Sequence, residues 1–571
     1  MKYYIRGKGS VKLTRNDFIF KGGEGIVYGK GNVAYKIFDD PARLIPEAKI
    51  RELAMLQRRE IINPLDAVLD KNNARVGFSM RLVKDAIPLA KLFTASFKKR
   101  NGITNTIILE LVEAMKEVIR YIHETGCLMV DGNEFNYLVD KSSFKYPYFI
   151  DVNSYQTPAF PATAIMPSIR DWHSNSFSEF TDWFSFAIIT FQLFVGLHPY
   201  KGRHPAYSRK AMGTSLLYNR MKDNVSVFNK DVSIPPSAGS LDSIPENYRN
   251  WFNNLFERGE RTPPPTTAGS VLTATSGKRI VKGTDRLEIK MLREFNSEIL
   301  AYKVVCGKEI IRTESHLYID GRTFEMDPGE KLILSPRTLT PVLAKVAQNE
   351  ASCRVLPAVV TPAKFPKIEC SEIMEIDNTL YFNCRDKLVE MQISEKNDRI
   401  IAAVKSLWNI LPKSNQVLDG LICQNALGAP YLVIPQPRPN GPSSCVNIHI
   451  PEIADFRILN ARHENRICMI VGHKDDRYSR IILKFDDSYK SYDIRIIEDI
   501  EYTGINFTVL DNGVVIAIND EGSLEIFSNR YGMDRIDILK DSNIESTMQL
   551  CKDGIAAKFY KRNQLFSIRM K

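Results

Sequence analysis

The stretch "LMVDGNEFNYLVD" at Leu128–Asp140 sets a group of polar side chains between two apolar runs. Asp131, Asn133, Glu134 and Asn136 all fall in this gap. A polar side chain that is buried costs free energy unless it is paired. The stretch is therefore either a turn that faces solvent or a site that holds a ligand. A D-x4-N spacing occurs in many Asx-rich turns. Other segments of the chain therefore have to show whether the stretch is a turn or a ligand site.

Two helical patterns flank this stretch. "TDWFSFAIITFQLFVGLHP", on its C-terminal side, is apolar on nearly all sides and predicts a helix buried in a helical core. Residues 104–256 are predicted to be mainly helical, whereas residues 1–82 show short strand patterns with one or two helices. On the N-terminal side, apolar residues follow the i, i+3, i+4, i+7 rule up to Gly126, namely Ile108, Leu111, Val112, Met115, Val118, Ile119 and Ile122.

A glycine-rich hairpin with a lysine on the following strand lies near the N-terminus. "FKGGEGIVYGKGNVAYKIF" carries Gly22, Gly23 and Gly25, and its last strand-like run carries Lys36. Glycines let the backbone approach a triphosphate closely and offer unhindered N–H donors to it. Such a hairpin alone is commonly only a hairpin, but a lysine on the next strand favours a phosphate site.

Acidic residues complete the pattern. A buried lysine needs a partner carboxylate, and Glu52 in "IPEAKIRELAMLQ" is the candidate, with Glu47 as the second choice. Asp151 ends the apolar strand of "YFIDVNSYQ", where a carboxylate can hold a divalent cation against phosphate oxygens. Asp182 opens the apolar helix, either as a first-turn acid or as an anchor for the loop around Asp131.

Taken in order, these elements resemble the protein-kinase fold over roughly residues 18–261. "IDVNSYQTP" is closer to bacterial and phage kinase-like proteins, in which the metal motif reads D-V-D-S-F/Y-Q. The resemblance implies a bilobal α+β domain at residues 1–262, with an N-lobe at about 1–83 and a C-lobe at about 84–262. It also implies an ATP- and Mg²⁺-dependent serine/threonine kinase.

The resemblance assigns a role to each matching residue. Lys36 would contact the α- and β-phosphates and pair with Glu52, and Asp131 would be the catalytic base. Magnesium would be held by Asn136 and Asp151, and Asp182 would be a structural anchor. The nucleotide would be covered by Gly22, Gly23, Gly25 and Val27, and its adenine would meet a hinge that includes Met80 and Leu82.

Several positions depart from the kinase pattern. Met129-Val130 stand in place of H-R, Asn133 replaces a phosphate-contacting lysine, and Asp151–Asn153 lacks the glycine of D-F-G. "MPSIRDWHS" is a distant substitute for A-P-E, and Arg261 is the candidate for the late structural arginine. Because the lysine and both aspartates are kept, an active enzyme is favoured. The alternative is a catalytically weak pseudokinase that acts as an interaction or assembly scaffold.

A different pattern begins after residue 262. Three prolines and a Thr/Ser/Gly cluster predict a linker at 263–278. Beyond it, β-branched and aromatic runs alternate with turn signals, which a repeat of about 40–50 residues with four strands would produce. Residues 279–571 therefore predict an all-β domain, a β-propeller of about seven blades, with a pair of stacked β-sandwiches as the alternative. The signals, spaced 42, 46, 47 and 41 residues apart, are Asp377-Asn378, Asp419-Gly420, Asn465, Asn512-Gly513 and Asp553-Gly554.

Composition limits the cellular setting and the partners. The nine cysteines never show CxxC spacing, the N-terminus lacks the apolar core of a signal peptide, and no apolar run reaches the roughly 18–20 residues of a membrane span. A cytoplasmic protein without a membrane partner is expected. Residues 1–270 carry 36 basic and 27 acidic side chains, nearly all of the net charge of +10. Such a surplus can attract phosphates or nucleic acid, but it is more commonly a solvated face, and no basic–aromatic ladder favours nucleic acid here. The propeller is expected to recruit a protein substrate or partner, and the oligomeric state stays open.

Overall fold

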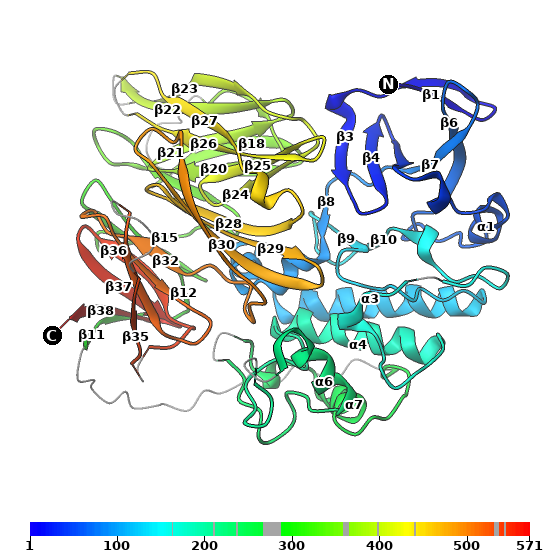
Figure 1. Cartoon of the computed structure of the whole chain (residues 1–571). Coiled ribbons are helices and arrows are strands. Elements are labelled where there is room, and N and C mark those ends of the chain that lie inside the picture. Colours follow the sequence, from blue (N-terminus) through cyan, green and yellow to red (C-terminus); the bar gives the residue numbers. More distant parts are fainter. Residues whose placement is uncertain are drawn as a thin grey trace. The chain divides into compact units, whose positions relative to one another are not determined.

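The computed structural model describes residues 1–570 except 163, 209–211, 236–237, 267–286, 358–364, 397–398, 439–440, 530–535 and 542–543. The chain divides into two compact units, one built mainly from its N-terminal half and one mainly from its C-terminal half (Figure 1). Most of the predicted linker, 263–278, and the predicted start of the β domain at 279 lie outside the described residues. In the described residues, no helix is both long enough and apolar enough to cross a membrane.

The first unit begins with an antiparallel sheet whose strand order is β2-β1-β6-β7-β5-β4-β3. Strand β5 lies inside this sheet, between β7 and β4, and the helix α1 (Glu47–Leu53) connects β5 to β6. Residues 1–82 thus form the short strands that their sequence predicts. The strands are β1 (Lys2–Ile5), β2 (Gly9–Lys12), β3 (Phe18–Lys21), β4 (Gly25–Lys30), β5 (Val33–Phe38), β6 (Pro64–Leu69) and β7 (Arg75–Arg81).

Helices make up most of the remaining regular structure of the first unit. The helix predicted before the polar stretch is α3 (Asn105–Glu124), and the apolar helix is α4 (Glu179–Val195), whose residues are all buried from Thr181 onward. Helix α4 stops at Gly196, which has a left-handed φ of 73°. The other elements are α2 (Ala95–Arg100), α6 (Leu216–Lys222), α7 (Glu246–Phe256) and a small sheet of β8 (Ala86–Pro88), β9 (Tyr137–Asp140) and β10 (Pro147–Phe149).

The second unit consists, in its described residues, of seven four-stranded antiparallel sheets. Six of them take four consecutive strands each, namely β12 (Ile299–Val305), β13 (Lys308–Thr313), β14 (Leu317–Ile319), β15 (Arg322–Phe324); β16 (Lys331–Leu334), β17 (Pro341–Ala347), β18 (Glu350–Val355), β19 (Ile368–Glu369); β20 (Glu372–Ile376), β21 (Thr379–Cys384), β22 (Lys387–Lys396), β23 (Arg399–Asn409); β24 (Asn415–Leu418), β25 (Leu421–Ala426), β26 (Ala429–Gln436), β27 (Ser444–His449); β28 (Arg457–Glu464), β29 (Ile467–Lys474), β30 (Arg477–Phe485), β31 (Tyr492–Ile497); β32 (Phe507–Val509), β33 (Val514–Ile518), β34 (Leu524–Ser528), β35 (Asp537–Leu539). The seventh joins β36 (Gln549–Asp553), β37 (Ala556–Lys561) and β38 (Gln564–Met570) to β11 (Leu287–Glu294).

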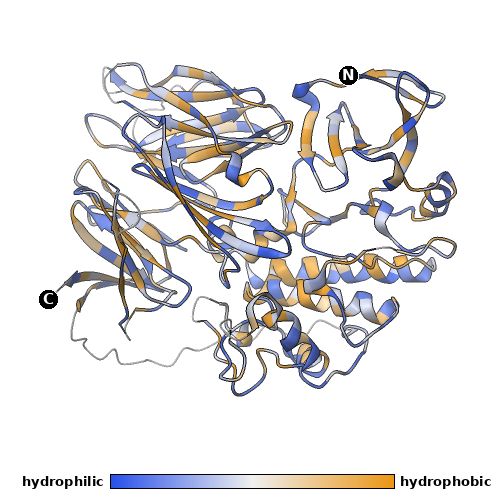
Figure 2. Cartoon of the chain, in the orientation of Figure 1, coloured by the Kyte–Doolittle hydropathy of each residue, from blue (hydrophilic) through white to orange (hydrophobic). Residues whose placement is uncertain are grey.

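Each of these sheets shares a buried apolar cluster with the next one along the chain. A further cluster, which includes Tyr302 of the first sheet and Leu565 of the seventh, joins the last sheet to the first. Hydrophobic and hydrophilic residues alternate along many of the strands (Figure 2), as expected where side chains point alternately to either side. The apolar faces are therefore buried between neighbouring sheets.

The turn signals found in the sequence all fall at one structural position. Each lies at the turn between the first two of the consecutive strands of a sheet, from the turn between β20 and β21 to the turn between β36 and β37. Left-handed φ angles recur there, for example 62° at Asn378 and 88° at Gly513. Asn, Asp and Gly adopt this conformation at the lowest cost, which is why the repeat is visible in the sequence.

Candidate functional site

The ammonium group of Lys36, in β5, is bound by three side-chain oxygens. Its Nζ lies 2.6 Å from Asp151 Oδ1, 2.7 Å from Glu24 Oε2 and 3.3 Å from Asn153 Oδ1. Glu24 stands between β3 and β4, whereas Asp151 and Asn153 follow β10. The large sheet and the helical part of the first unit therefore meet at this lysine.

The partners of Lys36 keep its charge. The side chain is only 10% exposed, and burial by itself lowers the pKa of an ammonium group. The carboxylates of Asp151 and Glu24 more than offset this, so that the pKa of Lys36 is raised above its usual value. The side chain is a fixed cation at neutral pH, as binding to a phosphate group requires.

The prediction that Glu52 pairs with Lys36 is wrong. Glu52 Oε2 instead accepts a hydrogen bond of 3.3 Å from the backbone N–H of Ala159. The reason is the rotational phase of α1, a helix of two turns whose buried residues are Lys49 and Leu53. Glu52 is only partly buried, and its carboxylate is occupied by the N–H of Ala159.

The glycines of the β3–β4 hairpin have different structural roles. The N–H of Gly22 donates to the carbonyl of Gly25 at 2.9 Å and closes the turn. At Gly25 a β-carbon would lie 2.1 Å from the carbonyl oxygen of Ile37, so only glycine allows β4 and β5 to approach this closely. At Gly23 a β-carbon would meet no described atom within 4 Å. Compared with Gly25, Gly23 is the residue with open space for a ligand.

Substituting Gly25 with alanine is expected to destabilise the first unit by about 2–3 kcal/mol, because the added methyl group collides with backbone rather than with a flexible side chain. Gly23→Ala is the matched control, with an expected change within about 0.5 kcal/mol. Urea unfolding of the full chain, followed by tryptophan fluorescence, measures both. Equal effects of the two substitutions would contradict the close approach at Gly25.

Asp131 lies in the loop between α3 and β9, and hydrogen bonds reach both of its oxygens. Oδ1 accepts the backbone N–H of Met166 at 2.9 Å, and Oδ2 accepts the amide groups of Asn133 at 3.0 Å and Asn136 at 3.4 Å. Burial raises the pKa of Asp131, and the nearby charge of Asp151 adds to this increase, whereas the hydrogen bonds reduce it. A carboxylate with a raised pKa is a stronger proton acceptor.

Asn136 and Asp151, the predicted magnesium ligands, offer suitable oxygens. The Nδ2 of Asn136 donates to the backbone oxygen of Asp131 at 2.8 Å, which leaves the amide oxygen as the possible ligand. The carboxylate of Asp151 is 31% exposed, and its backbone is left-handed with φ of 59°. Carboxylate and amide oxygens are what Mg²⁺ prefers. Among the described residues, no three His, Cys, Asp or Glu side chains form a metal cluster, so phosphate oxygens and water would have to complete the shell.

Asp182, in the first turn of α4, is hydrogen-bonded to the backbone of the loop that carries Asp131. Its two oxygens accept the N–H groups of Met129 and Val130, each at 2.8 Å, and Oδ2 also lies 2.9 Å from His123 Nε2. The carboxylate is only 2% exposed. Val130 has a φ of 62°, which is strained for a β-branched residue. The bonds of Asp182 therefore stabilise the turn that presents Asp131.

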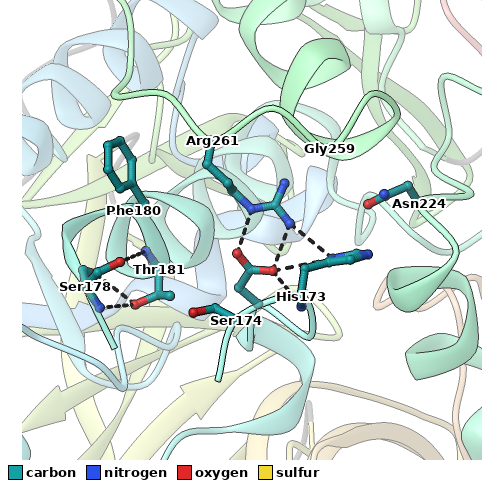
Figure 3. Close-up of a pocket in the computed structure, with 9 residues that line it drawn as sticks. His173, Ser174, Ser178, Phe180, Thr181, Asn224, Gly259 and Arg261 are labelled. Atoms are coloured by element: carbon teal, nitrogen blue, oxygen red, sulfur yellow. Dashed lines mark hydrogen bonds and ion pairs between the residues drawn. The ribbon is translucent and has the colours of Figure 1, made fainter. Parts of the chain in front are cut away.

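Arg261 binds Asp171 of the "MPSIRDWHS" segment through two hydrogen bonds. Figure 3 shows Arg261 beside His173 in the pocket that both residues line. The Nε of Arg261 lies 2.6 Å from Asp171 Oδ2 and its Nη2 lies 2.8 Å from Oδ1. Burial alone would raise the pKa of Asp171, but the guanidinium holds it below the usual value. Together with His173, Phe180 and Asn224 the pair lines a cavity of about 310 Å³. None of the residues predicted to bind nucleotide or metal lines this cavity. The pair joins the segment around Asp171 to the residues that follow α7.

The residues predicted to contact adenine follow the strands beside Lys36. Met80 is in β7, which pairs with β5, and Val27 of β4 lies opposite Lys36. Leu82 follows β7, and a β-carbon on Gly29 would lie 3.3 Å from its methyl groups. Adenine binding by Met80 and Leu82 stays a prediction.

Three residues at the site were not predicted. Glu24 takes the place expected for Glu52, and Asn153 was treated only as a departure from a motif. Gly132 lies where a β-carbon would be 2.7 Å from Met129 Cε and 2.9 Å from the hydroxyl of Tyr137. The available signal for Glu24 was an acidic side chain inside a glycine-rich turn that precedes the lysine strand.

No protein-family model matches the chain, and no curated protein matches it either. Solved structures that resemble it weakly are protein kinases. A twitchin kinase fragment from C. elegans, described as an autoregulated protein kinase with immunoglobulin domains, is 15% identical, with a TM-score of 0.34 over 46% of this chain and 55% of its own. The kinase PK-1 of Cydia pomonella granulovirus is 12% identical, with a TM-score of 0.30 over 42% of this chain and 88% of its own. The chain spans about half the length of the twitchin fragment.

Proposed function

We propose that this chain is an ATP- and Mg²⁺-dependent kinase that phosphorylates serine or threonine hydroxyls of a protein. The observation that carries the proposal is the contact of 2.6 Å between Lys36 Nζ and Asp151 Oδ1, near the half-buried carboxylate of Asp131. One ammonium group and two carboxylates come together from three separate segments. They are the groups that phosphoryl transfer needs for binding phosphate, holding a metal and accepting a proton.

Asp131 would act as the catalytic base. As the substrate oxygen attacks the γ-phosphorus of ATP, the bond from that phosphorus to the ADP oxygen breaks, and the hydroxyl proton passes to the carboxylate of Asp131. The amides of Asn133 and Asn136 orient this group through Oδ2. Oδ1 would then exchange the N–H of Met166 for the substrate hydroxyl. The raised pKa of Asp131 favours this transfer.

The other residues would bind and orient the nucleotide. Lys36 would hold phosphate oxygens as a fixed cation, and the backbone at Gly23 would approach them from the hairpin. Asn136 and Asp151 would hold Mg²⁺, which neutralises phosphate charge when it is bound. Asp182 acts through the backbone of the Asp131 loop and is a positioning residue.

The second unit would recruit the protein partner as a seven-bladed β-propeller. Support comes from its seven four-stranded sheets, from the apolar clusters that join each sheet to the next and the last to the first, and from the pairing of β11 with β38. A ring closed in this way leaves no free sheet face at its ends. Such a scaffold offers loops for binding, but the fold does not name the partner.

The alternative is a catalytically weak scaffold protein, and one observation favours it. Asn133 stands where a lysine would add positive charge at the transferred phosphate, and its amide is instead hydrogen-bonded to Asp131 at 3.0 Å. Without that charge, transition-state stabilisation is reduced. The chain would then bind nucleotide without transferring its phosphate.

A thermal-shift measurement on the full chain tests the nucleotide site. Saturating ATP with Mg²⁺ is expected to stabilise the first unit by about 2–3 kcal/mol at a hundred times the dissociation constant, which raises its melting temperature by several degrees. Asp151→Asn and Lys36→Met are expected to abolish this shift, because one removes a metal ligand and the other the phosphate cation.

Asp231→Asn is the control, since Asp231 is exposed and far along the chain from the residues of the site. Its shift should equal that of the unaltered chain. If the unaltered chain shows no shift with MgATP, or if both site variants keep the full shift, the proposed nucleotide site is wrong.

A further inference from the structure

The hydrogen-bonding capacity of Lys36 is already used. An ammonium group has three N–H donors, and three oxygens surround it: Glu24 Oε2, Asp151 Oδ1 and Asn153 Oδ1, at 2.7, 2.6 and 3.3 Å. An incoming phosphate oxygen therefore has to replace one of these three oxygens.

Glu24 is the partner that can leave at the lowest cost. Its side chain is 46% exposed, compared with 31% for Asp151, and Asn153 is buried. A carboxylate near the surface regains water when it leaves, whereas a buried one would stay unpaired. The backbone carbonyl of Glu24 accepts the N–H of Asp39 at 3.1 Å, so the side chain can rotate away while the hairpin keeps its bonds.

We propose that Glu24 is a built-in competitor for the phosphate position at Lys36, so that a polyphosphate binds only by displacing the Glu24 carboxylate. The inference rests on the proposed function for the identity of the nucleotide, but the exchange concerns the polyphosphate alone. The carboxylate of Glu24 thereby lowers the affinity of the site for a polyphosphate. It differs from a partner that merely orients the lysine, because its removal strengthens binding instead of weakening it.

The test is calorimetric titration of the full chain with MgATP and, separately, with inorganic tripolyphosphate. Glu24→Gln keeps the size of the side chain and removes the competing charge. It is expected to tighten the binding of both ligands by about tenfold, the size expected when one competing charge is removed from a half-exposed position where solvent screens it strongly. Glu47→Gln is the matched control, because Glu47 pairs with Arg6 at the surface at 2.6 Å and should change affinity less than twofold.

The outcomes separate this inference from the proposed function. If Glu24→Gln binds either ligand no more tightly than the unaltered chain does, the inference is overturned, even when MgATP binds well. If only tripolyphosphate binds, and Glu24→Gln binds it about tenfold more tightly, the inference stands and the nucleotide function falls. If Glu24→Gln binds neither ligand, both are overturned.

Discussion

Replacing Asp182 with alanine is expected to lower the free energy of unfolding of the first unit by about 3–5 kcal/mol. The substitution leaves the backbone N–H groups of Met129 and Val130 and the ring of His123 without their buried acceptor. Each buried donor that loses its partner costs about 1–3 kcal/mol. The strained φ of Val130 also loses the bond that holds it. Urea unfolding followed by tryptophan fluorescence measures the loss, since Trp172, Trp183 and Trp251 belong to this unit.

Asp242→Ala provides the comparison for this experiment. The side chain of Asp242 is 64% exposed and pairs with Arg249 at the surface, and an exposed pair contributes at most about 1 kcal/mol. Asp182→Asn keeps one acceptor oxygen and should fall between the two alanine variants. If Asp182→Ala unfolds at the same urea concentration as Asp242→Ala, the carboxylate does not hold the Asp131 loop.

Replacing Asp131 with asparagine is expected to reduce phosphoryl transfer by about 10²–10⁴-fold while leaving MgATP affinity within about threefold. The substitution keeps the size of the side chain but removes the proton acceptor that the proposed mechanism uses. Transfer is measured as label from γ-labelled ATP on the chain itself or on proteins of a cell lysate. Affinity is measured by calorimetry on the same preparations.

The split between transfer and binding distinguishes the enzyme from the scaffold. A base that acts only on the substrate hydroxyl lowers the rate and leaves nucleotide binding unchanged, whereas a purely structural aspartate would affect both. Asp231→Asn serves again as the exposed control. An unaltered chain that binds MgATP but labels neither itself nor any lysate protein would leave the scaffold alternative in place of the kinase.

The sequence was a reliable guide wherever the information is local. Helix α3 follows from apolar periodicity and α4 from a run that is apolar on nearly all sides. The recurring turns, such as Asp419-Gly420 and Asn512-Gly513, follow from residues that tolerate a left-handed backbone. The structure places Lys36 Nζ 2.6 Å from Asp151 Oδ1, and the roles predicted for the two residues remain predictions. Adenine, magnesium and protein binding remain predictions.

The partner of Lys36 shows where such reasoning ends. The amphipathic pattern predicts Glu52, but the phase of α1 buries Lys49 and Leu53 instead. Glu24 reaches the lysine because β3 and β4 form a tight turn, which Gly25 permits by its close contact with Ile37. Neither the phase nor the depth of this turn can be read from residue types alone.

By itself, the order of residues determined which segments are helices, where the repeated turns fall, and which charged groups are available. Those features depend on backbone preferences and apolar spacing that act over a few neighbouring residues. Only the tertiary structure decided that Glu24 and Asn153 share Lys36, that the N–H of Met166 binds Asp131, and that β11 pairs with β38. These contacts join residues far apart in the chain, so they depend on how complete sheets and helices pack, which no local pattern records.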